Sequence, residues 1–201
     1  QSLLSYLNFL FHNYLKGGLK FIFMKSKIKS QKELLLLIEQ LKQQGKRIVT
    51  TNGAFDILHT AHLHFLEKAK SLGDILIVLV NDDASVKHFK GEKRPILNEN
   101  ERTLHLAYLT PVDYLSLFPE DNPLNYLKLI KPYFHVKGGT FIPERIREEK
   151  ELLESWGGQF LTFPLEEGFS TTNIIQKIID VHKDTTDAHK SCPHESTEVF
   201  N

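Results

Sequence analysis

Apolar and polar residues along this chain follow two periodicities, and each predicts one kind of secondary structure. A short unbroken apolar run such as Ile75 to Val80 is typical of a strand that is buried on both faces. Apolar residues at helical spacing, as in Leu63, Leu66 and Ala69, indicate an amphipathic helix. On this basis we expect strands at Arg47 to Thr51, Ile75 to Val80, Val112 to Phe118, Tyr133 to Val136 and Gln159 to Phe163.

Helices are predicted between these strands. Ser30 and Glu33 form a capping-box pair at the start of the first helix, and Gly45 ends it. Further helices are expected at Thr60 to Leu72, Glu99 to Leu109, Asn122 to Ile130, Pro143 to Trp156 and Thr171 to Val181. Strands that alternate with helices are typical of an α/β fold, so we predict a Rossmann-like, doubly wound parallel sheet in a single domain, residues 30–181. Ligands in such sheets bind at the carboxyl ends of strands.

The two ends of the chain lie outside this predicted domain. Residues 1–29 are expected to be an N-terminal extension outside the native fold, and we expect the natural protein to start at Met24, the only methionine. The alternative for residues 1–23, which are rich in Leu, Phe and Tyr, is an interfacial amphipathic segment. Residues 182–201 are polar without periodicity, and we interpret them as a disordered tail.

Composition excludes several functional classes. Lys and Arg number 25 and Asp and Glu also number 25, which is unlike the basic footprint of a nucleic-acid-binding protein. The single cysteine, Cys192, fits a reducing compartment, so we expect a cytoplasmic protein. Polar residues interrupt the apolar N-terminal stretch too often for a membrane span.

The stretch from Thr50 to His62 carries the strongest functional signal. It is predicted to run from a strand through a tight turn into a helix, with His59 and His62 where the helix begins. A helix start offers unpaired backbone N–H groups and a partial positive charge, and both suit a phosphate. Two imidazoles three residues apart can donate to one phosphoryl group. A surface histidine beside a core histidine is the structural alternative.

Other candidates have structural alternatives as well. A predicted basic loop contains Lys87 and Lys90 and could be only a solvated charged segment. Arg102 could pair with a glutamate on its own helix surface, and Ser170 is in any case expected to cap the last helix. For Asp56 we prefer a structural role in the turn to a catalytic one.

Several spaced motifs resemble those of the cytidylyltransferase-like nucleotidyltransferases. The stretch from Thr51 to His62 is similar to the family's first signature, and Ser170, Thr171 and Thr172 are similar to its second. Members that adenylylate heptose 1-phosphate are the most similar, and the likeness runs from about Lys46 to Ile178. Shared residues include Lys87, Lys90, Arg102, Lys137, Gly138 and Gly139.

This resemblance implies transfer of AMP from ATP to D-glycero-β-D-manno-heptose 1-phosphate, which gives ADP-heptose for lipopolysaccharide core synthesis. His59, His62 and Lys90 would be catalytic, and Lys87 with Lys90 would bind the substrate phosphate. Mg²⁺ is implied with ATP, but no protein ligand for the metal is assigned. The residues implied in nucleotide binding are Asn52, Gly53, Ala54, Phe55, His59, His62, Arg102, Lys137, Gly138, Gly139, Ser170, Thr171 and Thr172.

The chain departs from the family pattern in three places. Ala61 replaces a glycine, and its methyl group would interfere if the residue had a positive φ or lay against the nucleotide. The segment Leu165 to Gly168 lacks an arginine that the cytidylyl-transferring relatives carry. Related bifunctional enzymes also have a sugar kinase domain, so we expect a separate kinase for that step.

Two alternatives to this function stay open. One is a cytidylyltransferase acting on a polyol or alcohol phosphate of the glycerol 3-phosphate type. The other is a nucleotide-binding protein without turnover, which the alanine at position 61 motivates. The resemblance also implies a homodimer or larger assembly. The balanced charge and the interrupted apolar stretch predict no nucleic-acid and no membrane partner.

Overall fold

The computed structural model describes residues 18–139, 143–164 and 168–190, and the chain divides into two compact units, residues 1–165 and 166–201. The first unit contains every strand of the described residues. The second contains a single helix, α8, at Thr171–Lys190. None of the helices in the described ranges is both long and apolar enough to cross a membrane.

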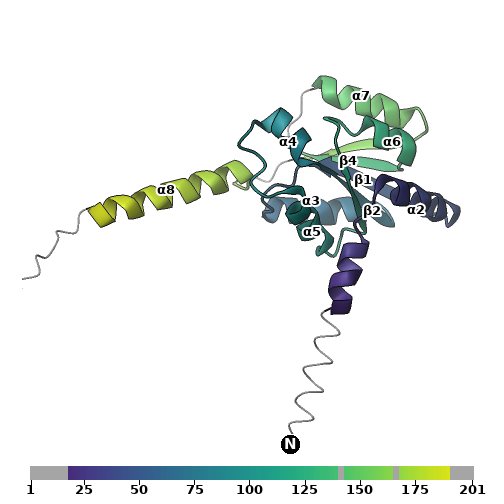
Figure 1. Ribbon diagram of the computed structural model, residues 1–201. Helices are drawn as coiled ribbons and strands as arrows, with labels where there is room; N and C mark the ends of the chain where they lie inside the picture. Colours follow the sequence, from purple (N-terminus) through teal and green to yellow (C-terminus); the bar gives the residue numbers. More distant parts are fainter. Residues whose placement is uncertain (1–17, 140–142, 165–167, 191–201) are drawn as a thin grey trace, which may run out of the picture. The chain divides into compact units, whose positions relative to one another are not determined.

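The first unit is built on a parallel five-stranded sheet with the order β3-β2-β1-β4-β5 (Figure 1). The chain leaves β1 towards β2 and β3, and it then returns to place β4 on the other side of β1. The prediction of a doubly wound α/β fold is therefore confirmed. The strands are β1 at Ile48–Gly53, β2 at Ile75–Asn81, β3 at Tyr114–Phe118, β4 at Phe134–Gly138 and β5 at Gln159–Phe163.

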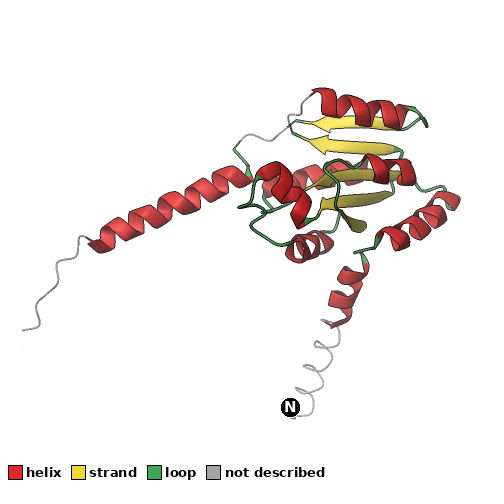
Figure 2. Ribbon diagram, turned by 45° about the horizontal axis from the view of Figure 1, so that its top comes forward, coloured by secondary structure: helices red, strands yellow, loops and turns green. Residues whose placement is uncertain are grey.

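Helices cover both faces of this sheet (Figures 1 and 2). On one face, α3 and α5 pack against a core that includes Val78 and Val80 of β2. On the other face, α2 and α6 pack against a core that includes Ile77 and Leu79 of the same strand. Because neighbouring residues of a strand point to opposite faces, this double burial explains the unbroken apolar run. The helix bounds are α2 at Gln31–Gln43, α3 at Thr60–Ser71, α4 at Asp83–Lys90, α5 at Glu99–Ala107, α6 at Leu124–Ile130 and α7 at Pro143–Glu154.

The predicted basic loop after β2 is wrong in its first part, because residues 87–90 belong to helix α4, whereas residues 91–95 are not helical. The side chain of Asp82 caps this helix by accepting from the backbone N–H of Ser85 at 2.7 Å, and Val86 anchors it in the core. Lys87 and Lys90 therefore lie one turn apart on a helix. A capping aspartate followed by a single apolar anchor was too weak a pattern to separate helix from loop.

Both ends of the predicted domain also differ from the structure. Residues 27–29 contact the sheet edge: Ile28 bridges to Leu115, and the Lys27 ammonium donates to the carbonyl oxygens of Leu109 and Val112. A helical segment at residues 18–26 precedes them. At the other end, α8 continues to Lys190, beyond the expected end at Val181. The expectations for residues 1–17 and 191–201 lie outside the described residues.

Candidate active site

The turn between β1 and α3 brings His59 and His62 face to face. His59 is the N-cap of α3 in an extended conformation, and its side chain makes no capping hydrogen bond. The two imidazole rings are stacked, with centroids 3.9 Å apart and planes inclined by 26°. The ring of Phe55, whose backbone has a φ of 47°, lies 5.3 Å from that of His62. The predicted histidine pair is thus a single compact feature at the start of a helix.

Burial keeps both imidazoles neutral near pH 7. It lowers the pKa of His62 to about 4, with smaller contributions from His59 and the Lys90 ammonium. Burial also lowers the pKa of His59. The Nδ1 atoms of both rings are buried, and neither has a hydrogen-bond partner among the described residues. Such atoms are costly unless a ligand or water pairs with them, so they mark a place where a bound group is expected.

Lys90 adds positive charge beside the histidine pair, since its ammonium group acts on His62. Burial lowers the pKa of Lys90, the Arg94 and Arg102 guanidinium groups lower it further, and Asp56 opposes them. Lys87 lies one turn earlier on α4, both lysines are solvent-exposed, and only Lys90 contributes to the lowered pKa of His62. The structure therefore places Lys90, rather than Lys87, within electrostatic reach of the histidines.

Asp56 has the structural role that we preferred for it. Its side chain is buried and accepts hydrogen bonds from the backbone N–H groups of Ile96 and Leu97, at 2.8 and 3.0 Å. Arg94 donates to the same carboxylate through Nε at 2.7 Å. Burial alone would raise the pKa of Asp56, but these hydrogen bonds and the guanidinium charge lower it on balance. Asp56 thus fastens the segment after α4 to the histidine turn.

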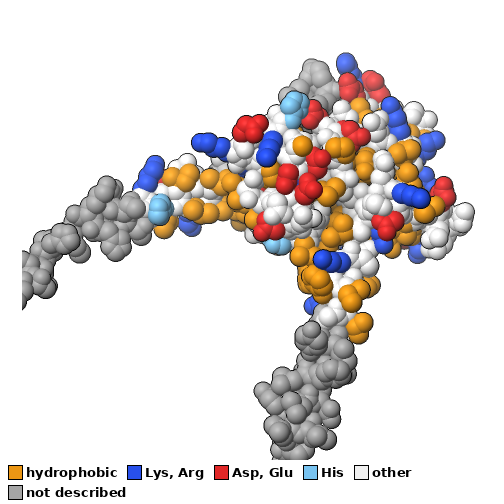
Figure 3. Space-filling model, in the orientation of Figure 1, with side chains coloured by type: hydrophobic (Ala, Val, Ile, Leu, Met, Phe, Trp, Pro, Cys, Tyr) orange, Lys and Arg blue, Asp and Glu red, His pale blue; other side chains and the backbone are white. Residues whose placement is uncertain are grey.

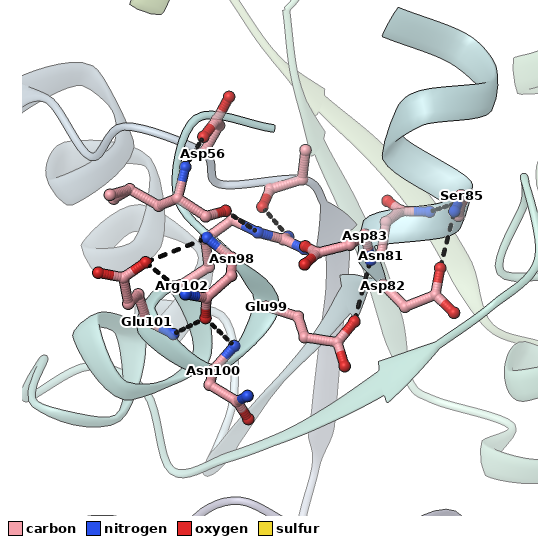
Figure 4. A network of polar contacts seen from close by, with 12 residues as sticks. Asp56, Asn81, Asp82, Asp83, Ser85, Asn98, Glu99, Asn100, Glu101 and Arg102 are labelled. Carbon is pink, nitrogen blue, oxygen red and sulfur yellow. Dashed lines mark hydrogen bonds and ion pairs between the residues drawn. The ribbon is translucent and has the colours of Figure 1, made fainter. Parts of the chain in front are cut away.

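Arg102 of helix α5 also stabilises the histidine turn through side-chain hydrogen bonds (Figure 4). It is fully buried on α5 and donates to the carbonyl oxygen of Ala54 at 2.6 Å and that of Leu97 at 3.0 Å. Its third partner is the carboxylate of Asp83, at 2.7 Å. The alternative pairing with a glutamate of its own helix is wrong. Arg102 acts on the loop backbone, and the proposal that it contacts the nucleotide itself stays untested.

A cleft of about 180 Å³ lies at the switch point between β1 and β4. It contains three of the predicted nucleotide-binding residues of the β1 end, Asn52, Gly53 and Ala54, and two from the β4 end, Lys137 and Gly138. The remaining lining residues were not predicted as site residues: Asn81, Phe89, Asp121, Asn122 and Glu149. Of these five residues, only Asn81 could have been predicted as a site residue from the sequence, because it directly follows a predicted strand.

Lys137 belongs to a buried polar chain that sequence reasoning missed. Its ammonium lies 2.5 Å from Oε1 of Glu149, and Nε2 of His135 lies 3.5 Å from the other carboxylate oxygen. Nδ1 of His135 lies 2.8 Å from the hydroxyl of Thr50. Burial lowers the pKa of His135, although Glu149 opposes this. Burial would raise the pKa of Glu149, but His135 and Lys137 lower it on balance.

Glycine is required at positions 138 and 139 for two different structural reasons. A Cβ atom on Gly138 would lie 2.9 Å from the ring of Phe65, so only glycine lets α3 pack this closely on β4. Gly139 has a φ of 120°, which other residues rarely adopt. These reasons concern packing and chain direction, and they are independent of any base pocket.

Ala61 and the second signature also have defined local structures. Ala61 lies in the first turn of α3 and is 8% exposed, so its methyl group is buried in the protein and its φ is not positive. In the second unit, the Ser170 hydroxyl accepts from the N–H of Asn173 at 3.0 Å, which confirms it as the cap of α8. Thr171 and Thr172 begin that helix.

Comparisons with known proteins agree on one family. The model of the cytidylyltransferase-like family matches residues 50–177. The bifunctional protein HldE of Pelobacter propionicus is 47% identical over 155 residues, covering 77% of this chain and 32% of the relative. That of Actinobacillus pleuropneumoniae serotype 5b is 48% identical over 151 residues, 75% of this chain and 32% of the relative. The chain thus spans about a third of the length of these curated relatives.

Two solved structures resemble the fold. A lipopolysaccharide core biosynthesis protein from Thermoplasma volcanium is 29% identical, with a TM-score of 0.50 over 61% of this chain and 98% of that one. Pantoate-beta-alanine ligase from Francisella tularensis, solved with an ATP derivative and beta-alanine, is 14% identical with a TM-score of 0.54 over 78% of each chain. The second likeness concerns the fold alone.

Proposed function

Because the chain belongs to the cytidylyltransferase-like family, we propose that it transfers AMP from ATP to a sugar 1-phosphate, with D-glycero-β-D-manno-heptose 1-phosphate as the acceptor. The products are ADP-heptose and pyrophosphate. The heptose acceptor is supported by the likeness to HldE proteins and to a lipopolysaccharide core biosynthesis protein.

The stacked pair of His59 and His62 is the observation that carries this proposal. In the reaction, an oxygen of the sugar phosphate forms a bond to the α-phosphorus of ATP while the bond to the bridging oxygen of pyrophosphate breaks. Negative charge builds up on the oxygens around the α-phosphorus. Two neutral imidazoles at a helix start, with Lys90 beside them, can stabilise this charge without any covalent step.

The remaining implied residues keep their roles as parts of the proposal. Ser170, Thr171 and Thr172 would bind the β- and γ-phosphates at the start of α8. Mg²⁺ would come with ATP and share the charge of the phosphates. Over the ranges that the structure describes, no group of three or more His, Cys, Asp or Glu residues is placed to hold a metal ion.

A pyrophosphate-release assay tests the reaction. The chain is incubated with ATP or CTP, each combined with heptose 1-phosphate, other sugar 1-phosphates and glycerol 3-phosphate. We expect release with ATP and heptose 1-phosphate. Preference for CTP with a polyol phosphate would establish the alternative transferase. Stabilisation by ATP without release from any combination would establish a binding protein.

Histidine variants test the assigned roles. We expect His59→Ala and His62→Ala each to lower kcat by at least a hundredfold, because each removes a donor to the transition-state charge. His64→Ala, an exposed histidine on the same helix, is the matched control and should keep kcat within twofold. Turnover that survives both substitutions would show that the catalytic groups lie elsewhere.

We further propose a homodimer or larger assembly, a separate sugar kinase and a cytoplasmic location. Sedimentation of the purified chain tests the first of these. Adding a candidate sugar kinase and its unactivated sugar substrate to the assay, in place of the sugar 1-phosphate, tests the second.

A further inference from the structure

The cleft at the switch point offers hydrogen-bonding groups that the transfer chemistry does not use. It begins at Gly53, the last residue of β1, and Ala54, the first residue of the loop that leads to the histidine pair, and it reaches Lys137 and Glu149. An acceptor whose phosphate lies near the histidine pair would therefore place its remaining atoms in this cleft.

The size of the cleft suits one part of a substrate. Its volume of about 180 Å³ is below the roughly 300–1,000 Å³ that is typical of sites for drug-sized ligands. A single sugar unit is a suitable occupant, whereas a whole nucleoside triphosphate is too large.

The lining favours hydroxyl groups. It combines carboxamides, carboxylates and one ammonium group, in Asn52, Asn81, Asn122, Asp121, Glu149 and Lys137. Oδ1 of Asn52 is buried without a hydrogen-bond partner among the described residues. A buried acceptor needs a donor, which a hydroxyl supplies and a phosphate oxygen does not.

The Lys137–Glu149 pair gives this lining a fixed geometry. The side chains are only 12% and 3% exposed, and His135 supports Glu149 from the core side. Nδ1 of His135 lies 2.8 Å from the Thr50 hydroxyl, and its Nε2 atom faces the carboxylate of Glu149 at 3.5 Å. A pair held in this way presents charge in one position, which is what selection among sugar stereoisomers requires.

We propose that this cleft binds the polyhydroxylated part of the acceptor phosphate, and that the Lys137–Glu149 pair determines which polyol is accepted. The inference rests on the proposed function. It assigns Lys137 and Gly138 to the acceptor and not to the nucleotide base.

The double variant Lys137→Met/Glu149→Leu removes the pair without leaving a buried charge, and such replacements often preserve folding. We expect KM for the sugar 1-phosphate to rise at least tenfold while KM for ATP stays within twofold. Glu148→Gln, an exposed neighbour on α7, is the matched control and should change neither constant. A rise in KM for ATP with an unchanged KM for the acceptor would overturn the proposal and make this a base pocket.

Deoxy analogues of the acceptor separate recognition from a structural effect. In the wild type, removing the hydroxyl that the pair contacts should lower kcat/KM at least tenfold. In Glu149→Gln, which keeps the side-chain volume, the same removal should matter much less. Equal losses in wild type and variant, for every analogue, would refute the assignment.

A binding measurement distinguishes failure of this inference from failure of the proposed function. If the wild type releases no pyrophosphate from any sugar 1-phosphate, the proposed function fails. Calorimetric titration with the same compounds then decides on the cleft. Binding to wild type and Glu148→Gln that is lost in the double variant supports the cleft assignment. Equal binding, or none to the wild type, contradicts it.

Discussion

Two buried charges, Asp56 and Arg102, hold the turn that carries the histidine pair. Both use side-chain groups to pair with backbone groups of neighbouring segments. The loop around them has few backbone–backbone hydrogen bonds of its own. These side-chain contacts therefore satisfy backbone groups that a helix or strand would satisfy within its own hydrogen-bond pattern. The conformation of the histidine turn therefore depends on two buried side chains, those of Asp56 and Arg102.

Replacing Arg102 with methionine tests this support. The change leaves the Asp83 carboxylate and two carbonyl oxygens without their partner, so we expect the free energy of unfolding in urea to fall by roughly 3–5 kcal/mol. Arg47→Met removes a 58% exposed side chain from a 3.9 Å ion pair and should cost less than about 1 kcal/mol. Equal stability of the two variants would show that Arg102 does not support the turn.

His62 predicts a pH dependence of stability. Its pKa is about 4 in the folded chain and about 6.5 when unfolded. Between these values the unfolded state binds the proton, so stability falls as pH decreases from 6.5 towards 4 and is unaffected by this group above pH 7. We expect His62→Gln to reduce the loss of unfolding free energy between pH 7 and pH 4.5 by on the order of 2 kcal/mol. Identical pH profiles in urea titrations would contradict the assignment.

At the scale of secondary-structure elements, the first turn of α3 determines the relative orientation of His59 and His62. Ala61 lies between them, in a helical conformation and buried against the protein. In such a position alanine is the better helix former. The glycine that relatives carry there is therefore not required by the backbone of this chain.

Ala61→Gly tests whether the methyl group matters to the ligand. We expect the free energy of unfolding to fall by about 1 kcal/mol, because glycine is the poorer helix former. The kcat/KM for ATP should stay within twofold. An increase in kcat/KM of more than tenfold would instead show that the methyl group obstructs the nucleotide.

Over the whole molecule, basic and acidic residues are equal in number and are interspersed on the surface. The formal net charge is zero and the pI is about 7.3. Figure 3 shows Lys and Arg interspersed with Asp and Glu on the visible face. Recognition of anionic substrates thus depends on a local cluster of groups and not on the field of the whole protein.

This balance predicts a solubility minimum close to the pI. Net charge near zero promotes association, so we expect the least soluble protein near pH 7.3 and higher solubility at pH 6 and pH 9. Precipitation with polyethylene glycol across this range measures the effect. A monotonic change in solubility with pH would contradict it.

Part of the candidate site could be read from residues that are neighbours in the sequence. The apolar runs and capping residues determined the parallel α/β sheet, because each depends on local periodicity. The histidine turn and Ser170 were also visible, since a strand–turn–helix signal involves only adjacent residues. Family membership followed from the same spaced motifs.

Only the tertiary structure decided which distant residues share the site. Glu149 and His135 join Lys137 because α7 packs beside β4 and β5, and no local pattern marks a helix glutamate as buried. Likewise Arg102 pairs with Asp83 because α5 returns beneath the histidine turn. Periodicity reports which face of an element is buried, whereas contacts between elements depend on how they assemble. The sequence by itself therefore determined the fold and the histidine turn, and folding decided the cleft beside it.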